Sequence, residues 1–394
     1  MSTLEELLDN LLFASRSKTE QGSKFEVLMA SYLRTAPEYA DRFGEVHLWH
    51  DWPQRQGRDT GIDLVARDVV TGGWCAIQCK FYAPDQHLAK KDIDSFIAAS
   101  NTAAFTSRMV ISTARDWGSN LEAQMATLTP PVVRVGVHDL LGSKVDWSAI
   151  DWEGQVETVL PTTGKKTLRP HQREAKDAVL EGLLAHDRGQ LVMACGTGKT
   201  FTSLKIAEQV ALDNKARATQ VLFLVPSIQL LNQTLREWKQ ESEIPFRAFA
   251  VCSDNKVGRR TSEDVGIQDL IYPATTDTAV LARELRTRHT DEAFTVVFST
   301  YQSIDVVARA QAEGMPDFDL IICDEAHRTT GVTLAGEDES AFVRVHSSAY
   351  LKARKRLYMT ATPRLFNPDT KDKGRDADAV LASMDDEATF GPVL

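Results

Sequence analysis

Residues 193–200 read Met-Ala-Cys-Gly-Thr-Gly-Lys-Thr, between an apolar run that ends at Val192 and an amphipathic pattern that continues to Val210. A strand, a loop of small residues and a helix, in this order, are typical of a loop that binds nucleoside triphosphates. Its backbone N–H groups close around phosphate oxygens at a helix N-terminus, where the helix dipole also favours negative charge. Without support from other motifs, residues 193–200 could also be a simple turn before a helix. The nucleotide-binding residues that we predict are Gly196, Thr197, Gly198, Lys199 (to the β- and γ-phosphates) and Thr200 (to Mg²⁺).

Composition indicates a globular chain of about two domains. Of the 394 residues 43% are hydrophobic and 25% are charged, and the formal net charge is −10. This charge argues against nucleic-acid binding over the whole surface but is compatible with a local basic groove. No run of about 18 apolar residues predicts a membrane span, and the N-terminus does not read as a secretory signal. Five cysteines, an odd number, favour reduced thiols over a disulfide framework, so we expect a cytoplasmic protein.

The sequence divides into two segments joined by a linker. Residues 1–150 carry mixed helix and strand patterns, whereas residues 151–166 are mostly polar and contain a proline and two glycines, which predicts a linker. Residues 167–394 alternate short β-rich runs with helical patterns, which predicts a parallel α/β sheet. Near the end of this segment, we expect residues 365–378 to form a mobile surface loop.

In the first segment two strand-like runs are predicted to pair as a hairpin. The runs 61–66 and 74–82 are separated by a Thr-Gly-Gly sequence. A two-residue turn centred on residues 71–72 makes paired positions sum to 143, which places Asp63 opposite Lys80.

The same pairing places Gln78 opposite Val65, and residues two apart on a strand share a face. We therefore expect Asp63, Gln78 and Lys80 to lie together in an otherwise apolar region. Burying such charges is costly unless they are paired or bind a metal, so a structural ion pair is one interpretation. The other is phosphodiester hydrolysis: Asp63 would hold Mg²⁺, Gln78 would orient the metal or the attacking water, and Lys80 would stabilise charge or activate that water.

The residues Gly-Ile-Asp, 61–63, followed by Gln-Cys-Lys, 78–80, resemble the Mrr-like branch of the PD-(D/E)XK endonucleases, in which Gln replaces the usual Glu. The resemblance implies a restriction-endonuclease fold, with Asp63 and Gln78 as metal ligands. Glu26, which flanks an apolar helical stripe, matches the helix carboxylate of this family, and Asp59 is a weaker candidate. The implied catalytic residues are Asp63, Gln78, Lys80 and Glu26.

In the second segment the apolar run 318–323 reads as a buried strand that ends in Asp-Glu-Ala-His, 324–327. At this position in a nucleotide-driven motor, Asp324 is predicted to hold Mg²⁺ and Glu325 to polarise the attacking water. Isolated Asp-Glu pairs at strand ends are common, so the interpretation depends on its neighbours.

Those neighbours resemble the motifs of superfamily 2 helicases, in the expected order. The resemblance implies that Gln172 contacts adenine and that His327 links the nucleotide site to the DNA-contacting motifs. Met193 is a departure, since the strict phosphate loop begins with Gly. The other matching segments are residues 221–227 and 298–302, which resemble strand-contacting motifs, and residues 358–363, which resemble the motif that couples hydrolysis to movement.

A Mrr-like nuclease followed by one RecA-like domain is similar to the N-terminal part of type ISP restriction–modification enzymes. The resemblance implies an ATP-dependent endonuclease with ATP and Mg²⁺ as cofactors, in which a motor translocates on double-stranded DNA and delivers the nuclease. Only about thirty residues follow Pro363, which is too few for another domain. We therefore expect a second RecA-like lobe, a methyltransferase and a target-recognition domain outside this chain. The chain itself would bind nucleotide but turn it over poorly. The alternatives are a nuclease–helicase without methyltransferase and a non-cleaving, ATP-sensing DNA-binding module.

Overall fold

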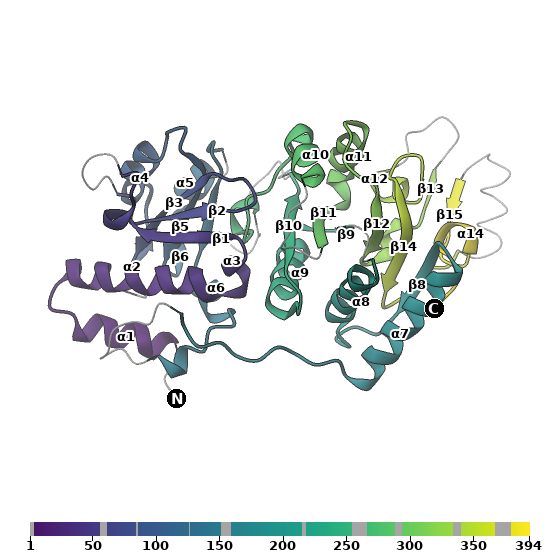
Figure 1. The fold of residues 1–394 in the computed structure, drawn as a ribbon, viewed down its shortest axis with the longest axis horizontal. Helices are drawn as coiled ribbons and strands as arrows, with labels where there is room; N and C mark the ends of the chain where they lie inside the picture. The colour runs from purple at the N-terminus through teal and green to yellow at the C-terminus, as the bar shows by residue number, and fades with distance from the viewer. Residues whose placement is uncertain are drawn as a thin grey trace. The chain divides into compact units, whose positions relative to one another are not determined.

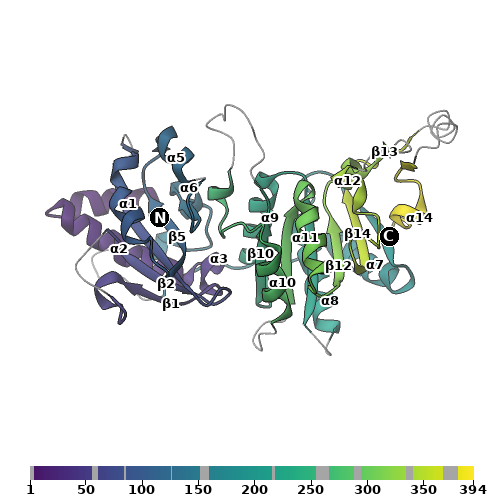
Figure 2. The same ribbon diagram turned by 90° about the horizontal axis from the view of Figure 1, so that it is seen from above.

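The computed structural model describes residues 4–55, 61–83, 86–125, 127–150, 159–214, 218–253, 266–287, 294–333, 340–366 and 380–394. The chain forms two units, Met1–Lys165 with Val265–Pro273 and Lys166–Asp264 with Ala274–Leu394 (Figures 1 and 2). Three predictions fall wholly or partly outside the described residues. They concern Asp59, half of the linker and the greater part of the loop at 365–378.

The first unit contains a mixed sheet in the order β1-β2-β3-β5-β7. Strands β1, β2 and β3 pair antiparallel, whereas β3, β5 and β7 pair parallel. Helix α2 contacts β1 and β3 (Figure 1). The main elements are α1 (Leu4–Ala14), α2 (Lys18–Thr35), α3 (Pro37–Ala40), β1 (Phe43–Leu48), β2 (Leu64–Asp68), β3 (Trp74–Lys80), α4 (Asp94–Ala99), β5 (Phe105–Ser112), α5 (Ser119–Met125), β7 (Val132–Val135) and α6 (Val137–Leu141), with a short pair β4 (His87–Leu88) and β6 (Asp116–Trp117).

An aromatic core covers one face of this sheet. Trp52 packs against Trp49 and Trp74, with ring centroids 5.5 and 5.2 Å away. Alternate residues of β3 face this core, because successive strand residues point to opposite faces. The core thus contains Trp74 and Ala76, and Gln78 and Lys80 continue the same alternation toward the end of the strand.

The register of β2 and β3 differs from the predicted one by two residues. Val65 pairs with Ala76, so paired positions sum to 141. The predicted pairings of Val65 with Gln78 and of Asp63 with Lys80 are therefore wrong. A shift of two positions keeps the side-chain alternation, so Gln78 and Lys80 still share a face, whereas Asp63 lies one residue before β2.

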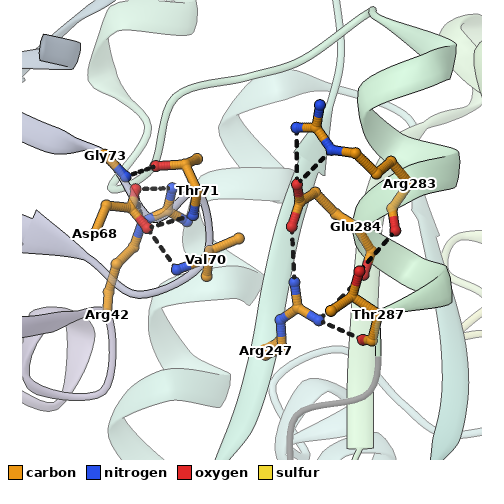
Figure 3. Close-up of polar contacts among 9 residues, drawn as sticks. All are labelled: Arg42, Asp68, Val70, Thr71, Gly73, Arg247, Arg283, Glu284 and Thr287. Carbon is orange, nitrogen blue, oxygen red and sulfur yellow. Dashed lines mark hydrogen bonds and ion pairs between the residues drawn. The ribbon is translucent and has the colours of Figure 1, made fainter. Parts of the chain in front are cut away.

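The cause is a four-residue connection in place of a two-residue turn. The Asp68 N–H donates to the Gly73 carbonyl at 3.0 Å, which closes the connection. The Asp68 carboxylate accepts the N–H groups of Val70 and Thr71 at 2.9 and 3.2 Å, and it also accepts two bonds from Arg42 at 2.6 and 3.0 Å (Figure 3). A buried ion pair that sequence spacing does not reveal thus fixes the connection.

The second unit contains a parallel sheet in the order β10-β11-β9-β12-β14-β8, which confirms the predicted parallel α/β sheet. Connections between parallel strands are right-handed, so the face on which a helix lies depends on the direction in which the chain moves across the sheet. Helices of connections that move one way lie on one face, and helices of connections that move the other way lie on the opposite face. Accordingly α8 contacts α7 and α9, and α10 contacts α11. The main elements are α7 (Pro170–Ala185), β8 (Arg188–Val192), α8 (Lys199–Asp213), β9 (Thr219–Val225), α9 (Ile228–Glu241), β10 (Phe246–Val251), α10 (Thr278–Arg286), β11 (Phe294–Thr300), α11 (Ile304–Ala312), β12 (Phe318–Cys323), β13 (Gly331–Thr333), α12 (Ala341–Arg344), β14 (Ala353–Thr360), β15 (Val380–Ala382) and α14 (Glu387–Phe390).

A charged network attaches α10 to the edge strand β10. Arg247 donates to the carbonyl oxygens of Glu284 and Thr287, both at 3.2 Å. The Glu284 carboxylate in turn accepts two bonds from Arg283, at 2.9 and 3.0 Å (Figure 3). The bonds of the buried Arg247 guanidinium thus connect the edge of the sheet to the end of α10.

Residues 266–273, between β10 and α10 in the sequence, pack within the first unit. Asp269 pairs with Arg134, and the Arg42 guanidinium lies 4.4 Å from the centroid of the Tyr272 ring. Arg42 therefore contacts both this segment and Asp68, the residue that shapes the β2–β3 connection.

Candidate nuclease and nucleotide sites

The β2–β3 pair brings the predicted nuclease residues to one end of the strand pair. Asp63 directly precedes β2, and its N–H donates to the Ile77 carbonyl at 2.9 Å. Its Oδ2 accepts the Cys79 N–H at 2.7 Å, which orients the carboxylate. The β2–β3 ladder ends with Leu64 opposite Ile77, so Asp63 lies directly beyond its end, and Gln78 and Lys80 share a face of β3.

Gln78 carries an unusual buried oxygen. Its side chain is 1% exposed, and Oε1 has no hydrogen-bond partner among the described residues. An unsatisfied buried acceptor costs about 1–3 kcal/mol, so such an atom calls for an explanation. A Cβ added at Gly61, where φ is 90°, would lie 3.6 Å from Gln78 Nε2 and 2.9 Å from Ser95 Oγ. Glycine is thus required where the chain passes closest to this amide.

These residues fit Mg²⁺, a hard cation that prefers carboxylate and carbonyl oxygens. Asp63 offers the carboxylate and Gln78 offers the unpartnered carbonyl oxygen. Lys80, half-buried at the end of β3, supplies a positive charge beside them.

Glu26, half-buried on α2, lies close enough to Cys79 to act on its thiol. Burial raises the pKa of the Cys79 thiol well above its ordinary value, and the Asp63 and Glu26 carboxylates raise it further, whereas Lys80 lowers it. All three charges therefore lie close enough to act on one thiol.

In the second unit the phosphate loop has the shape that its sequence predicts. Gly196 and Gly198 adopt left-handed conformations, with φ of 75° and 90°, which glycine permits at little cost. Helix α8 begins at Lys199, whose Nζ donates to the Met193 carbonyl at 3.3 Å. The first turn of α8 thus directs its free N–H groups into the loop, and a lysine lies across it.

Gln172 contacts this loop directly. Its Oε1 accepts the Arg169 N–H and its Nε2 donates to the Thr197 carbonyl, each at 2.9 Å. One amide hydrogen and one acceptor lone pair remain, so the predicted adenine contact is compatible with these bonds. On the other side, the Trp238 indole donates to the Thr200 carbonyl at 3.1 Å, a support from α9 that no sequence motif revealed.

Asp324 follows β12 and is 7% exposed. The pKa of Asp324 is raised to about 6, mainly by burial and also by the neighbouring Glu325 carboxylate, whereas the Glu325 N–H and Lys199 act to lower it. The influence of Lys199 shows that the phosphate loop and the end of β12 lie near one another. Asp324 Oδ1 is buried and has no partner among the described residues. An orphaned carboxylate oxygen near the phosphate-loop lysine fits a Mg²⁺ ligand.

Glu325, at φ 50°, is a non-glycine residue in the left-handed region. Its Oε2 lies 3.3 Å from His327 Nδ1, and this nitrogen lies 3.1 Å from Thr360 Oγ1. The Thr360 carbonyl accepts the Met193 N–H at 3.0 Å. A continuous set of contacts thus connects the candidate water-polarising carboxylate, the histidine, β14 and the start of the phosphate loop.

Comparison with protein families places both halves of the chain. A model described as restriction endonuclease, of Mrr type, matches residues 34–157, and a model described as type III restriction enzyme, res subunit, matches residues 165–365, half of the chain. The chain belongs to the type III restriction enzyme res subunit family. The Mrr-type match contains Asp63, Gln78 and Lys80, whereas Glu26 lies before its first residue.

A solved structure of this class matches the whole chain. The ATP-dependent type ISP restriction–modification enzyme LlaBIII bound to DNA is 38% identical, with a TM-score of 0.83, and covers 100% of this chain and 24% of its own. A nuclease-deletion mutant of the type ISP enzyme LlaGI is 44% identical over 58% of this chain and 19% of its own, with a TM-score of 0.45. The predicted fold class and the type ISP resemblance are thereby confirmed.

A curated relative, a probable helicase of African swine fever virus, is 31% identical over 51% of this chain and 20% of its own length. The chain thus spans about a fifth of this viral relative and about a quarter of LlaBIII. Within the described ranges, every helix is too short or too polar to span a bilayer.

Proposed function

We propose that this chain contains the nuclease and the first motor lobe of an ATP-dependent DNA restriction endonuclease that acts on double-stranded DNA. One observation carries the proposal. Each predicted site contains a buried oxygen without a hydrogen-bond partner among the described residues, Gln78 Oε1 in the nuclease unit and Asp324 Oδ1 in the motor unit. Both are ligands of the type that Mg²⁺ prefers.

In the nuclease unit Asp63 and Gln78 hold the metal, which when bound withdraws charge from the phosphate. Lys80 stabilises the negative charge that develops on the phosphate, because a fixed cation in a partly buried site stabilises it more strongly than water does. The Cys79 N–H keeps the Asp63 carboxylate oriented. Glu26 is the second carboxylate of the proposed site and acts from α2.

In the motor unit Lys199, Thr200 and the loop glycines bind the phosphates of ATP, with Asp324 as the second protein ligand of Mg²⁺. Glu325 orients the attacking water. His327 contacts both the Glu325 carboxylate and the Thr360 hydroxyl in β14, so it connects the carboxylate to that strand. ATP hydrolysis then drives translocation on DNA when a second RecA-like lobe, outside this chain, closes the site. As a restriction enzyme, the protein would act in the cytoplasm together with methyltransferase and target-recognition domains.

Two variants separate the two activities. Asp63→Asn should abolish Mg²⁺-dependent nicking of plasmid DNA and leave the affinity for ATP unchanged. Lys199→Ala should abolish ATP binding and leave nicking that does not depend on translocation. If both variants lose both activities, the assignment of two independent sites is wrong. If neither the wild type nor a variant nicks DNA while ATP still binds, the chain is a non-cleaving module.

A further inference from the structure

The peptide group between Asp324 and Glu325 is held on both sides. The Tyr301 hydroxyl donates to the Asp324 carbonyl at 2.8 Å. The Glu325 N–H bonds to the Asp324 carboxylate, and this bond opposes the rise in the pKa of that group. The orientation of this one peptide therefore sets both the Asp324 carboxylate and the backbone of Glu325.

The conformation that follows this peptide is strained. Glu325 has a φ of 50°, where the side chain of an L-residue crowds the backbone. Rotation of the Asp324–Glu325 peptide would relieve the strain, but it would break the bond to Tyr301. A strained residue persists only where its surroundings determine its geometry, and the Tyr301 hydroxyl is one such determinant.

Tyr301 is itself fixed. Its side chain is fully buried, directly after β11, and its ring stacks on Phe342 with centroids 5.0 Å apart and an interplanar angle of 30°. The next residue, Gln302, directs its amide toward the Pro226 carbonyl at 3.5 Å. Tyr301 belongs to the segment that resembles a strand-contacting motif, and its hydroxyl reaches the residue that follows β12.

We propose that Tyr301 is a positioning residue of the nucleotide site, whose hydroxyl holds the Asp324–Glu325 peptide so that Asp324 presents its free oxygen to Mg²⁺. This inference rests on the proposed function of the motor unit. The phosphate loop needs no contribution from Tyr301, because its glycines and Lys199 are arranged by α7, α8 and β14.

The test is Tyr301→Phe in the 394-residue chain, which removes one hydroxyl and retains the ring. Affinity for a fluorescent ATP analogue is measured with saturating Mg²⁺ and with EDTA. We expect the affinity in EDTA to equal that of the wild type, which also shows that the variant is folded. The gain in affinity from Mg²⁺ should fall about three- to tenfold, the effect of one lost hydrogen bond.

Tyr350→Phe is the matched control, because it also removes one tyrosine hydroxyl, but one that bonds the Asp305 carboxylate at 3.1 Å and not the Asp324–Glu325 peptide. It should retain the Mg²⁺-dependent gain of the wild type. An unchanged gain in Tyr301→Phe would overturn the inference, as would an equal loss in both variants, which would indicate a general effect of losing a tyrosine hydroxyl. If the wild type itself binds the analogue equally in Mg²⁺ and in EDTA, the proposed motor site is wrong.

Discussion

Acidification should weaken Mg²⁺-dependent nucleotide binding in a range where an ordinary aspartate would not respond. Burial raises the pKa of Asp324 to about 6. Mg²⁺ requires the ionised carboxylate, so a proton and the metal compete for the same group. At about pH 8 Asp324 is almost fully ionised, and at about pH 5 only about a tenth is ionised. The Mg²⁺-dependent gain in affinity should therefore fall about tenfold, or ~1.4 kcal/mol, whereas a carboxyl with an ordinary pKa of about 3.9 would lose less than about a tenth of its ionised form.

The assay is titration of a fluorescent ATP analogue with and without Mg²⁺ across this pH range. Asp324→Asn is the matched control, since it keeps the shape of the side chain and cannot titrate. Protonation of the nucleotide phosphates affects both proteins equally, so the ratio of their Mg²⁺-dependent gains isolates Asp324. A ratio that stays constant down to about pH 5 would refute the assignment of Asp324 as the metal ligand.

The same shift has the opposite sign for folding without metal. The native carboxyl retains its proton between its unfolded value, near 4, and about 6, so the native state binds more protons in that window. The contribution of Asp324 to stability is therefore largest below about pH 4 and is lost as the pH rises through about 6. In EDTA, Asp324→Asn should remove this dependence from the unfolding free energy of the motor unit.

Two further predictions follow from backbone and ion-pair geometry. Gly198→Ala should abolish nucleotide binding, because φ is 90° and the new Cβ would lie 2.2 Å from Gln172 Nε2. Gly196→Ala is the milder change, since φ is 75° and the new Cβ would have no atom within 4 Å, and it should weaken nucleotide binding only a few-fold in the same titration. Arg42→Met should lower the unfolding free energy of the first unit by about 3–5 kcal/mol in a urea titration, because it leaves the Asp68 carboxylate, 1% exposed, buried without its cation. A loss below about 1 kcal/mol would show that water replaces the guanidinium there.

The phosphate loop and the strand that precedes Asp324 were predictable from sequence, because their signals are local. Small residues directly before a helix specify backbone that binds phosphate, and a continuous apolar run specifies a buried parallel strand. The shared face of Gln78 and Lys80 was also predictable, since it depends only on the two-residue period of a strand.

Contacts between residues distant in sequence were not predictable. The register of β2 and β3 depends on Asp68 and its ion pair with Arg42, 26 residues earlier, and the spacing of strand residues contains no trace of that pair. Sequence likewise assigned Tyr301 to a strand-contacting motif, although its hydroxyl bonds the backbone at Asp324.

The proposed function requires that the first unit cleaves DNA and that the residues around Gln78 do so with a metal. The most direct measurement is nicking of supercoiled plasmid by the 394-residue chain as a function of Mg²⁺ concentration, for the wild type and for Asp63→Ala. We expect nicking that requires Mg²⁺ in the wild type and none above background in Asp63→Ala, with equal nucleotide affinity in both. Equal nicking by the two proteins would contradict it.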